Sequence, residues 1–177
     1  FINCTDMVSL TFSGQTVGPC AFSGCIALEE VTMNAVVVVH AKAFQQCCSL
    51  REVVFPNATT IGDCCFAFCV FLTHATLDAA TVLGREAFRG CKNLIHVDIP
   101  KVCRICENTF VGDGSLKRVA ATSVTHIGTH AFSRCSALTF PCMPHLWKIG
   151  NAAFKNALKD NDTVVSDAEH VLESAFM

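Results

Sequence analysis

The feature that most constrains this chain is a strict period of 22 residues. Phenylalanine marks one phase of the period, where eight of the fourteen phenylalanines lie. They are Phe22, Phe44, Phe66, Phe88, Phe110, Phe132, Phe154 and Phe176. Cysteine recurs three residues after this position and leucine six residues after it, so several independent positions keep one register along the chain. Repeats of roughly 20–50 residues are typical of solenoids, in which each unit buries its apolar side chains against its neighbours.

Each repeat predicts the same local structure. In the unit that begins at Cys47, Val53 and Phe55 are apolar residues two positions apart, which is the pattern of a short strand with one buried face. Stacked units would pair these strands in parallel at about 4.8 Å. The Ile61-Gly62 pair predicts a turn, because glycine accepts conformations and close contacts that other residues cannot. The segment that carries the phenylalanine is expected to be short and helical or irregular, with the ring directed into the core.

Length and composition limit the organisation of the chain and its classes of partner. With 177 residues, 51% of them hydrophobic, the chain can form one domain with a core or one repeat array. We predict a single array of about eight 22-residue repeats over residues 1–177, and we expect a fragment of a longer protein because the chain opens at Phe1. The net charge of −2 disfavours a nucleic-acid partner held by bulk charge. No apolar run approaches the length of a bilayer span, so we expect no direct membrane insertion.

The repeat resembles a known family. The motif Cys-x-x-Leu-x-x-Val-x-(Met/Ile/Phe)-Pro, followed by Val-x-x-Ile-Gly-x-x-Ala-Phe, is similar to the BspA-like leucine-rich repeat, and its clearest copies begin at Cys47 and Cys91. The resemblance implies an α/β repeat fold, a right-handed leucine-rich-repeat solenoid with a concave parallel β-sheet and short helical or irregular convex segments. It also implies a non-catalytic surface or secreted protein, because members are mostly such proteins of host-associated bacteria and protozoa, implicated in adhesion and protein binding. The chain departs from the motif at Cys65, Thr109, Asp113 and Ala157.

Thirteen cysteines raise the question of disulfides or metal. Those in the repeat phase are predicted to be buried thiols, because parallel stacking would hold their Cβ atoms about 4.8 Å apart, too far for a disulfide. Some of the others could pair in an exported protein. Cys103 and Cys106 form a Cys-x-x-Cys pair, but a structural zinc ion needs four ligands, and only His126 lies close in phase. We therefore predict no metal and no cofactor, and interpret the pair as packing and turn residues.

No sequence motif indicates catalysis. The chain contains seven histidines but no Gly-x-Ser-x-Gly, His-Glu-x-x-His or phosphate-binding glycine loop. A solenoid with short loops also lacks the deep apolar pocket that small molecules prefer. We therefore predict a protein without enzyme activity and without a small-molecule substrate. Glycosylation sequons at Asn3, Asn57 and Asn161 favour an exported protein, although coincidence in a threonine-rich chain would explain them as well.

The outward side chains of the predicted strands form the candidate binding surface. They flank the inward residues and change along the array from acidic through imidazole to basic and apolar. The predicted partner-binding residues are Glu30, Thr32, Glu52, Val54, His74, Thr76, His96, Asp98, Arg118 and Phe140. An extended surface of this kind suits a protein or peptide partner, and the alternative is an ordinary solvated face. His74 and His96 are expected to be neighbours on adjacent strands, which predicts a pH-sensitive contact.

The leading functional hypothesis is an adhesin-like surface or secreted module that binds a protein through its concave face. The alternative is an intracellular scaffold subunit of a larger protein assembly. Many free thiols fit a reducing compartment better than an oxidising one, which keeps this alternative open.

Overall fold

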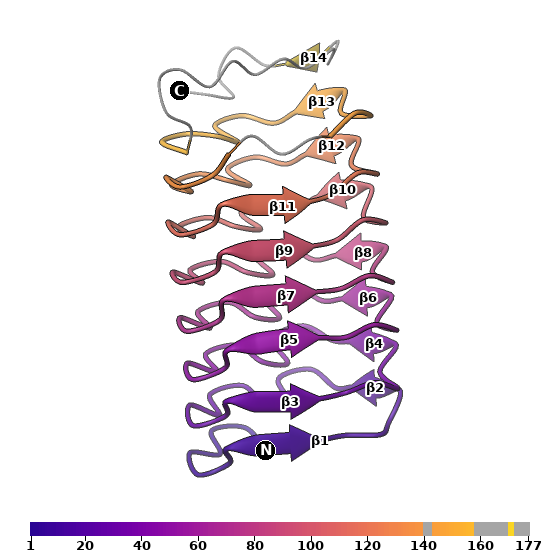
Figure 1. Ribbon diagram of the computed structural model, residues 1–177, viewed down its shortest axis with the longest axis vertical. Coiled ribbons are helices and arrows are strands. Elements are labelled where there is room, and N and C mark those ends of the chain that lie inside the picture. Colours follow the sequence, from indigo (N-terminus) through magenta and orange to yellow (C-terminus); the bar gives the residue numbers. More distant parts are fainter. Residues whose placement is uncertain (140–142, 158–169, 172–177) are drawn as a thin grey trace.

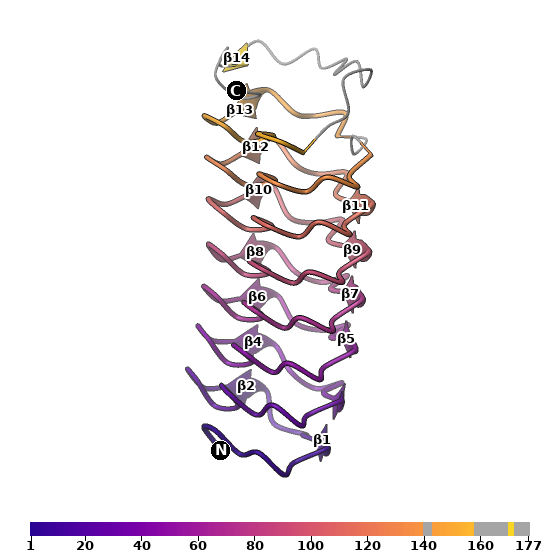
Figure 2. The same ribbon diagram turned by 90° about the vertical axis from the view of Figure 1, so that its left-hand side faces the viewer.

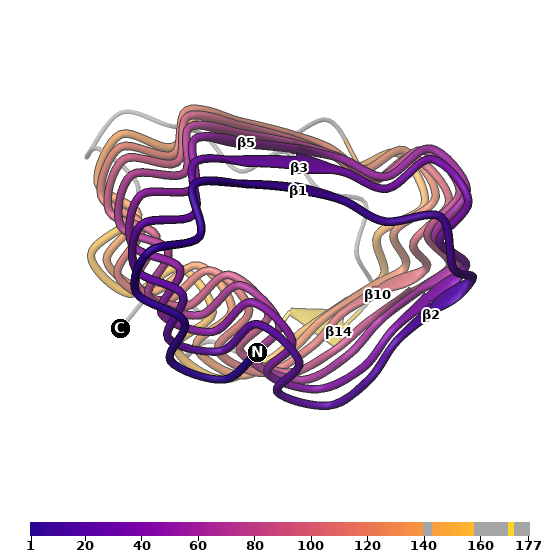
Figure 3. The same cartoon turned by 90° about the horizontal axis from the view of Figure 1, so that it is seen from below.

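In the computed structural model the chain winds into a solenoid whose coils stack along one axis (Figures 1 and 2). The structure describes residues 1–139, 143–157 and 170–171. Seen from below, the chain runs clockwise as it recedes from the viewer, so the solenoid is right-handed (Figure 3). Each coil corresponds to one repeat of the sequence and contributes one three-residue strand, one two-residue strand or both.

The three-residue strands stack into the parallel sheet that the sequence predicted. They are β1 (Ser9–Thr11), β3 (Glu30–Thr32), β5 (Glu52–Val54), β7 (His74–Thr76), β9 (His96–Asp98) and β11 (Arg118–Ala120). Their pairing is parallel in the order β1-β3 and β5-β7-β9-β11. The middle residue of each strand faces the core, as the burial of Val53, Val97 and Val119 shows. We call the outer side of these strands the long-strand face.

A second column of two-residue strands lies on another side of each coil (Figure 3). Its members are β2 (Thr16–Val17), β4 (Val38–Val39), β6 (Thr60–Ile61), β8 (Val82–Leu83), β10 (Arg104–Ile105), β12 (His126–Ile127), β13 (Lys148–Ile149) and β14 (His170–Val171). They pair in parallel in the orders β2-β4-β6-β8 and β10-β12-β13-β14. The second residue of each of these strands from β2 to β13 is buried, so the first residue forms the outer row. We call the outer side of this column the short-strand face.

The helical part of the α/β expectation is not confirmed, because the described residues contain no helix. The phenylalanine segment is a series of turns whose backbone amides bond alternately to the next coil and within their own coil. In one coil the bonds to the next coil are Lys42 N to Asp63 O (2.8 Å), Phe44 N to Cys65 O (2.9 Å) and Gln46 N to Ala67 O (2.9 Å). Lys42 and Gln46 also have positive φ angles of 60° and 62°, which interrupt any right-handed helix. The described residues therefore form a parallel β-solenoid with leucine-rich-repeat periodicity.

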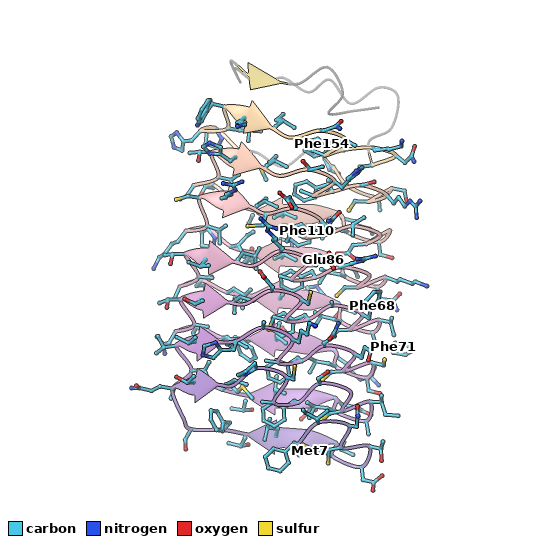
Figure 4. The ribbon with its side chains drawn as sticks, turned by 180° about the vertical axis from the view of Figure 1, so that it is seen from behind. Met7, Phe68, Phe71, Glu86, Phe110 and Phe154 are labelled. Atoms are coloured by element: carbon cyan, nitrogen blue, oxygen red, sulfur yellow. The ribbon has the colours of Figure 1, made fainter. Side chains whose placement is uncertain are left out.

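The phenylalanines fill the centre of the stack, as predicted. Neighbouring rings from Phe1 to Phe154 lie with centroids 5.2–5.6 Å apart and planes within 17° of each other. Every phase phenylalanine from Phe22 to Phe154 is buried, and Figure 4 shows Phe110 and Phe154 inside the coils. Stacked aromatic rings stabilise a core beyond the area they bury, so this ladder stabilises the stack of coils.

The cysteines that lie three residues after the repeated phenylalanines are buried thiols beside the stacked rings, which confirms their predicted placement. Each thiol donates a hydrogen bond to the carbonyl of a phenylalanine one coil earlier. The bonds are Cys47 to Phe22, Cys69 to Phe44, Cys91 to Phe66 (3.1 Å each) and Cys135 to Phe110 (3.0 Å). Burial raises the pKa of the Cys47 thiol to about 12, so the thiol remains protonated and able to donate.

Asp113 interrupts this thiol ladder. Its side chain is fully buried between Cys91 and Cys135 in phase, and neither carboxylate oxygen has a hydrogen-bond partner. Burial raises the pKa of the Asp113 carboxyl well above its usual range, and the nearby backbone amides of Cys91 and Gly90, which do not reach ordinary hydrogen-bond geometry, offset only part of that effect. The other departures from the motif pack without this cost: the Thr109 hydroxyl donates to the Cys106 carbonyl at 2.9 Å, and Cys65 is buried.

Candidate functional site

The long-strand face carries two outward rows of side chains in fixed register. The first row is Ser9, Glu30, Glu52, His74, His96 and Arg118, and the second row is Thr11, Thr32, Val54, Thr76, Asp98 and Ala120. All of these residues are exposed or half-exposed, which confirms that the predicted stripe points away from the core. Phe140, the last residue of that stripe, lies outside the described residues. Whether the stripe binds a partner remains a prediction.

The charge of the first row changes sign along the stack. Near β3 and β5 a shallow hollow of about 310 Å³ is lined by Glu29, Glu30, Glu52 and Arg51, among others. Arg51 Nε lies 3.4 Å from Glu29 Oε2, so one guanidinium stands against three carboxylates. At the other end of the row stands Arg118. A partner with a basic residue at one end of its contact surface and an acidic residue at the other would be complementary to this row.

The two histidines at the middle of the row are neighbours, as the sequence predicted. His74 pairs in register with His96 across β7 and β9. The two rings have different partners, because His96 Nε2 lies 2.9 Å from Asp98 Oδ1 whereas His74 Nδ1 lies 3.0 Å from Thr73 Oγ1. In the predicted pH-sensitive contact, the Asp98 carboxylate therefore lies beside the His96 imidazole and not beside the His74 imidazole.

Two exposed phenylalanines flank the long-strand face, and sequence reasoning did not single them out. Phe71 is 56% exposed and lines a second hollow of about 320 Å³ with Ile95 and Arg51. Phe68 is 40% exposed, and Figure 4 shows both rings at the same edge of the solenoid. The backbone at Phe68 has a positive φ of 64°, which is rare for a bulky residue. A sequence signal existed, since the same position holds glycine in three other repeats, at Gly24, Gly90 and Gly112.

The ring of Phe68 packs against Gly90 and Arg89. A Cβ atom on Gly90 would lie 2.8 Å from Phe68 Cδ1, so the glycine leaves the space that the ring occupies. The Arg89 guanidinium lies 5.8 Å from the ring centroid and 3.0 Å from Glu86 Oε2. This cation–π contact holds the aromatic edge in place beside an ion pair.

The short-strand face carries a second row that sequence reasoning also missed. Arg104, His126 and Lys148 lie side by side in register on β10, β12 and β13. The signal was present as the same 22-residue spacing, but a two-residue strand shows no alternation that marks its outward residue.

The Cys103–Cys106 pair brackets β10 and is not gathered with other ligands. Cys103 is exposed and its thiol lies 3.8 Å from the Lys101 carbonyl, while Cys106 is half-buried. The Nδ1 atom of His126 contacts the Thr125 hydroxyl at 2.8 Å. Among the described residues no three histidine, cysteine or acidic side chains are grouped as a metal would require.

The fold and the repeat register are matched by known proteins. The profile of the BspA type leucine-rich repeat region matches residues 1–117 and 38–161. This chain belongs to the BspA-type leucine-rich repeat family. Leucine-rich repeats of this kind are in general binding modules rather than enzymes. No curated protein matches the sequence significantly.

Solved structures of leucine-rich repeat proteins share the fold of this BspA-type chain. The protein from T. pallidum is 29% identical with a TM-score of 0.72, and the match covers 78% of this chain and 68% of that one. The protein from Eubacterium ventriosum is 24% identical with a TM-score of 0.76, covering 90% and 45%. A leucine-rich cell surface protein from Faecalibacterium prausnitzii is 19% identical with a TM-score of 0.58, covering 99% and 62%. The chain thus spans less than two thirds of the last two proteins.

In the part of this BspA-type chain that the structure describes, no helix is long and apolar enough to cross a bilayer.

Proposed function

We propose that this BspA-type leucine-rich repeat is a non-catalytic, adhesin-like module of the cell surface that binds a protein through its long-strand face. The observation that carries the proposal is the first row of that face, in which side chains from acidic Glu30 to basic Arg118 are held in register. Family membership supports a binding role, and the Faecalibacterium protein with the same fold is described as a cell surface protein.

Binding at the long-strand face would use surface complementarity rather than a deep pocket. The face offers a shallow hollow of about 310 Å³ between β3 and β5, a second hollow of about 320 Å³ at its edge, and a row of small side chains at Thr32, Val54 and Thr76. A surface with small central residues admits close approach of another protein, while charges of opposite sign at the two ends set the orientation of the partner. Phe68 and Phe71 at its edge are aromatic residues, a type that is enriched in protein interfaces.

A peptide library displayed on phage tests the proposal without a known partner. Peptides selected on the wild-type chain are tested on Glu30→Lys/Glu52→Lys, which reverses two charges of the first row. The matched control is Asp6→Lys/Asp78→Lys, which makes the same change of net charge at exposed residues outside both rows. We expect most selected peptides to lose binding to the first variant and to keep it on the second. Equal binding to wild type and both variants would contradict a function of this face.

A further inference from the structure

The outer row of the short-strand face changes character halfway along the stack. Its first four rungs carry uncharged side chains, and its next three carry basic or imidazole side chains. The row reads Thr16, Val38, Thr60 and Val82, then Arg104, His126 and Lys148. The backbone of β14 continues the register and places residue His170 beside Lys148.

Folding does not require these basic residues. Arg104 and Lys148 lie two rungs of the parallel sheet apart, roughly 10 Å, with His126 between them, so the two cations repel one another over that distance. The first half of the same column shows that threonine and valine fill the position without repulsion. Two cations around an imidazole, at positions that uncharged residues fill elsewhere in the same fold, point to a ligand.

The surroundings of the row leave its charge available. Among the described residues, neither Arg104 nor Lys148 takes part in an ion pair. Glu107, an acid that lines the same hollow, has Arg85 Nη1 3.6 Å from its Oε2 atom. The ion pair between Glu107 and Arg85 is neutral. The charges of Arg104 and Lys148 therefore remain uncompensated on either side of His126.

A shallow hollow of about 330 Å³ lies along the row. Gly128 and Gly150 form part of its floor, where backbone of one coil packs on backbone of the coil before it. A Cβ atom at either glycine would lie 2.7 Å from a backbone atom of that earlier coil, so the floor stays flat. His126 is braced on two sides, because its Nδ1 contacts the Thr125 hydroxyl at 2.8 Å and the Trp147 ring meets it edge-on with centroids 4.7 Å apart.

We propose that the short-strand face from Arg104 to Lys148 binds an acidic polysaccharide, with its carboxylate or sulfate groups on the basic row and a sugar ring near Trp147. The cations lie in single file along an open groove, which fits a linear chain with repeated negative groups. The indole of Trp147 is 41% exposed beside that file and offers a flat apolar surface of the kind on which sugar rings pack. A single phosphate would instead require convergent donors in an enclosed site. The proposal does not depend on the long-strand face.

Binding of the chain to dextran sulfate and to hyaluronan tests this site, with uncharged dextran as the reference. Arg104→Thr/Lys148→Thr installs the residue that the row carries at Thr16 and Thr60. The control Lys92→Thr/Lys117→Thr removes two positive charges at exposed residues outside the outer rows of both faces. We expect the first pair to weaken binding by roughly tenfold and the control by less than about twofold. Far-UV circular dichroism and melting temperature confirm that both variants are folded.

The remaining outcomes each decide the question. Binding to dextran sulfate but not to hyaluronan would assign the site to sulfate groups, and the reverse would assign it to carboxylates. Equal loss in both variants would overturn the proposal in favour of general charge attraction. Poly-glutamate or oligo-deoxythymidine could bind as tightly as the polysaccharides and lose the same affinity in Arg104→Thr/Lys148→Thr. That result would overturn the proposal and assign the row to another class of polyanion. Failure of both polysaccharides to bind at low salt would also overturn it.

Discussion

Replacement of Asp113 by cysteine should stabilise the protein, and more strongly at pH 7 than at pH 5. Both carboxylate oxygens are buried without a hydrogen-bond partner, and burial raises the pKa of this carboxyl well above its usual range. The folded protein therefore keeps a proton that the unfolded chain releases at about pH 4. Raising the pH removes that proton only from the unfolded chain, so it favours unfolding.

The magnitude follows from proton linkage and from the thiol ladder. While the folded carboxyl stays protonated, each pH unit above about 4 lowers the free energy of unfolding by about 1.4 kcal/mol. From pH 5 to pH 7, the advantage of Asp113→Cys over wild type should thus grow by up to about 2.7 kcal/mol. The new thiol would face the Phe88 carbonyl, by the register of the Cys91 and Cys135 bonds, and would make the thiol ladder continuous at every pH.

Urea unfolding followed by far-UV circular dichroism at pH 5, 6 and 7, in the presence of a reductant, measures these differences. Asp113→Asn is the matched control, because it removes the titrating group but leaves a buried amide in a site without partners. It should share the pH dependence of Asp113→Cys and be less stable than that variant. Parallel stability profiles of wild type and Asp113→Cys over this pH range would refute the idea that Asp113 is a buried neutral acid.

Three further predictions concern the core, the basic row and the location of the protein. Phe88→Ala should cost about 3–5 kcal/mol of unfolding free energy in urea titrations, because the ring is fully buried and stacks on both neighbours. Dextran sulfate should bind more tightly as the pH falls, because partial burial, then Arg104 and Lys148, lower the pKa of His126 below 6.5. The Glu107 carboxyl is the other titratable group that lines this hollow. Fluorescence titrations with dextran sulfate at several pH values measure the affinity, and a constant affinity would exclude a role for the His126 imidazole. Intact mass of the native protein after thiol alkylation should reveal disulfides and glycan mass if the protein is exported, whereas fully alkylated thiols and a bare mass would favour the intracellular scaffold.

The sequence determined the architecture because its period leaves little choice. A chain that repeats phenylalanine, cysteine and leucine every 22 residues can bury them together only by stacking identical coils. The stacking of the phenylalanine rings, the buried thiols, the parallel strands and the neighbouring positions of His74 and His96 all follow from that register. These features could be predicted because residues one period apart in sequence are neighbours in space.

The tertiary structure decided what periodicity does not encode. The phenylalanine segment is not helical, because its amides alternate between the next coil and their own coil, and this choice depends on the neighbouring backbone. The burial of Asp113 without a partner also depends on the surrounding coils, since the sequence shows only that a cysteine is missing. The outward row of Arg104, His126 and Lys148 became visible only when the two-residue strands were placed in a column. A period identifies which residues share a column of the stack, whereas three-dimensional packing decides which columns face water.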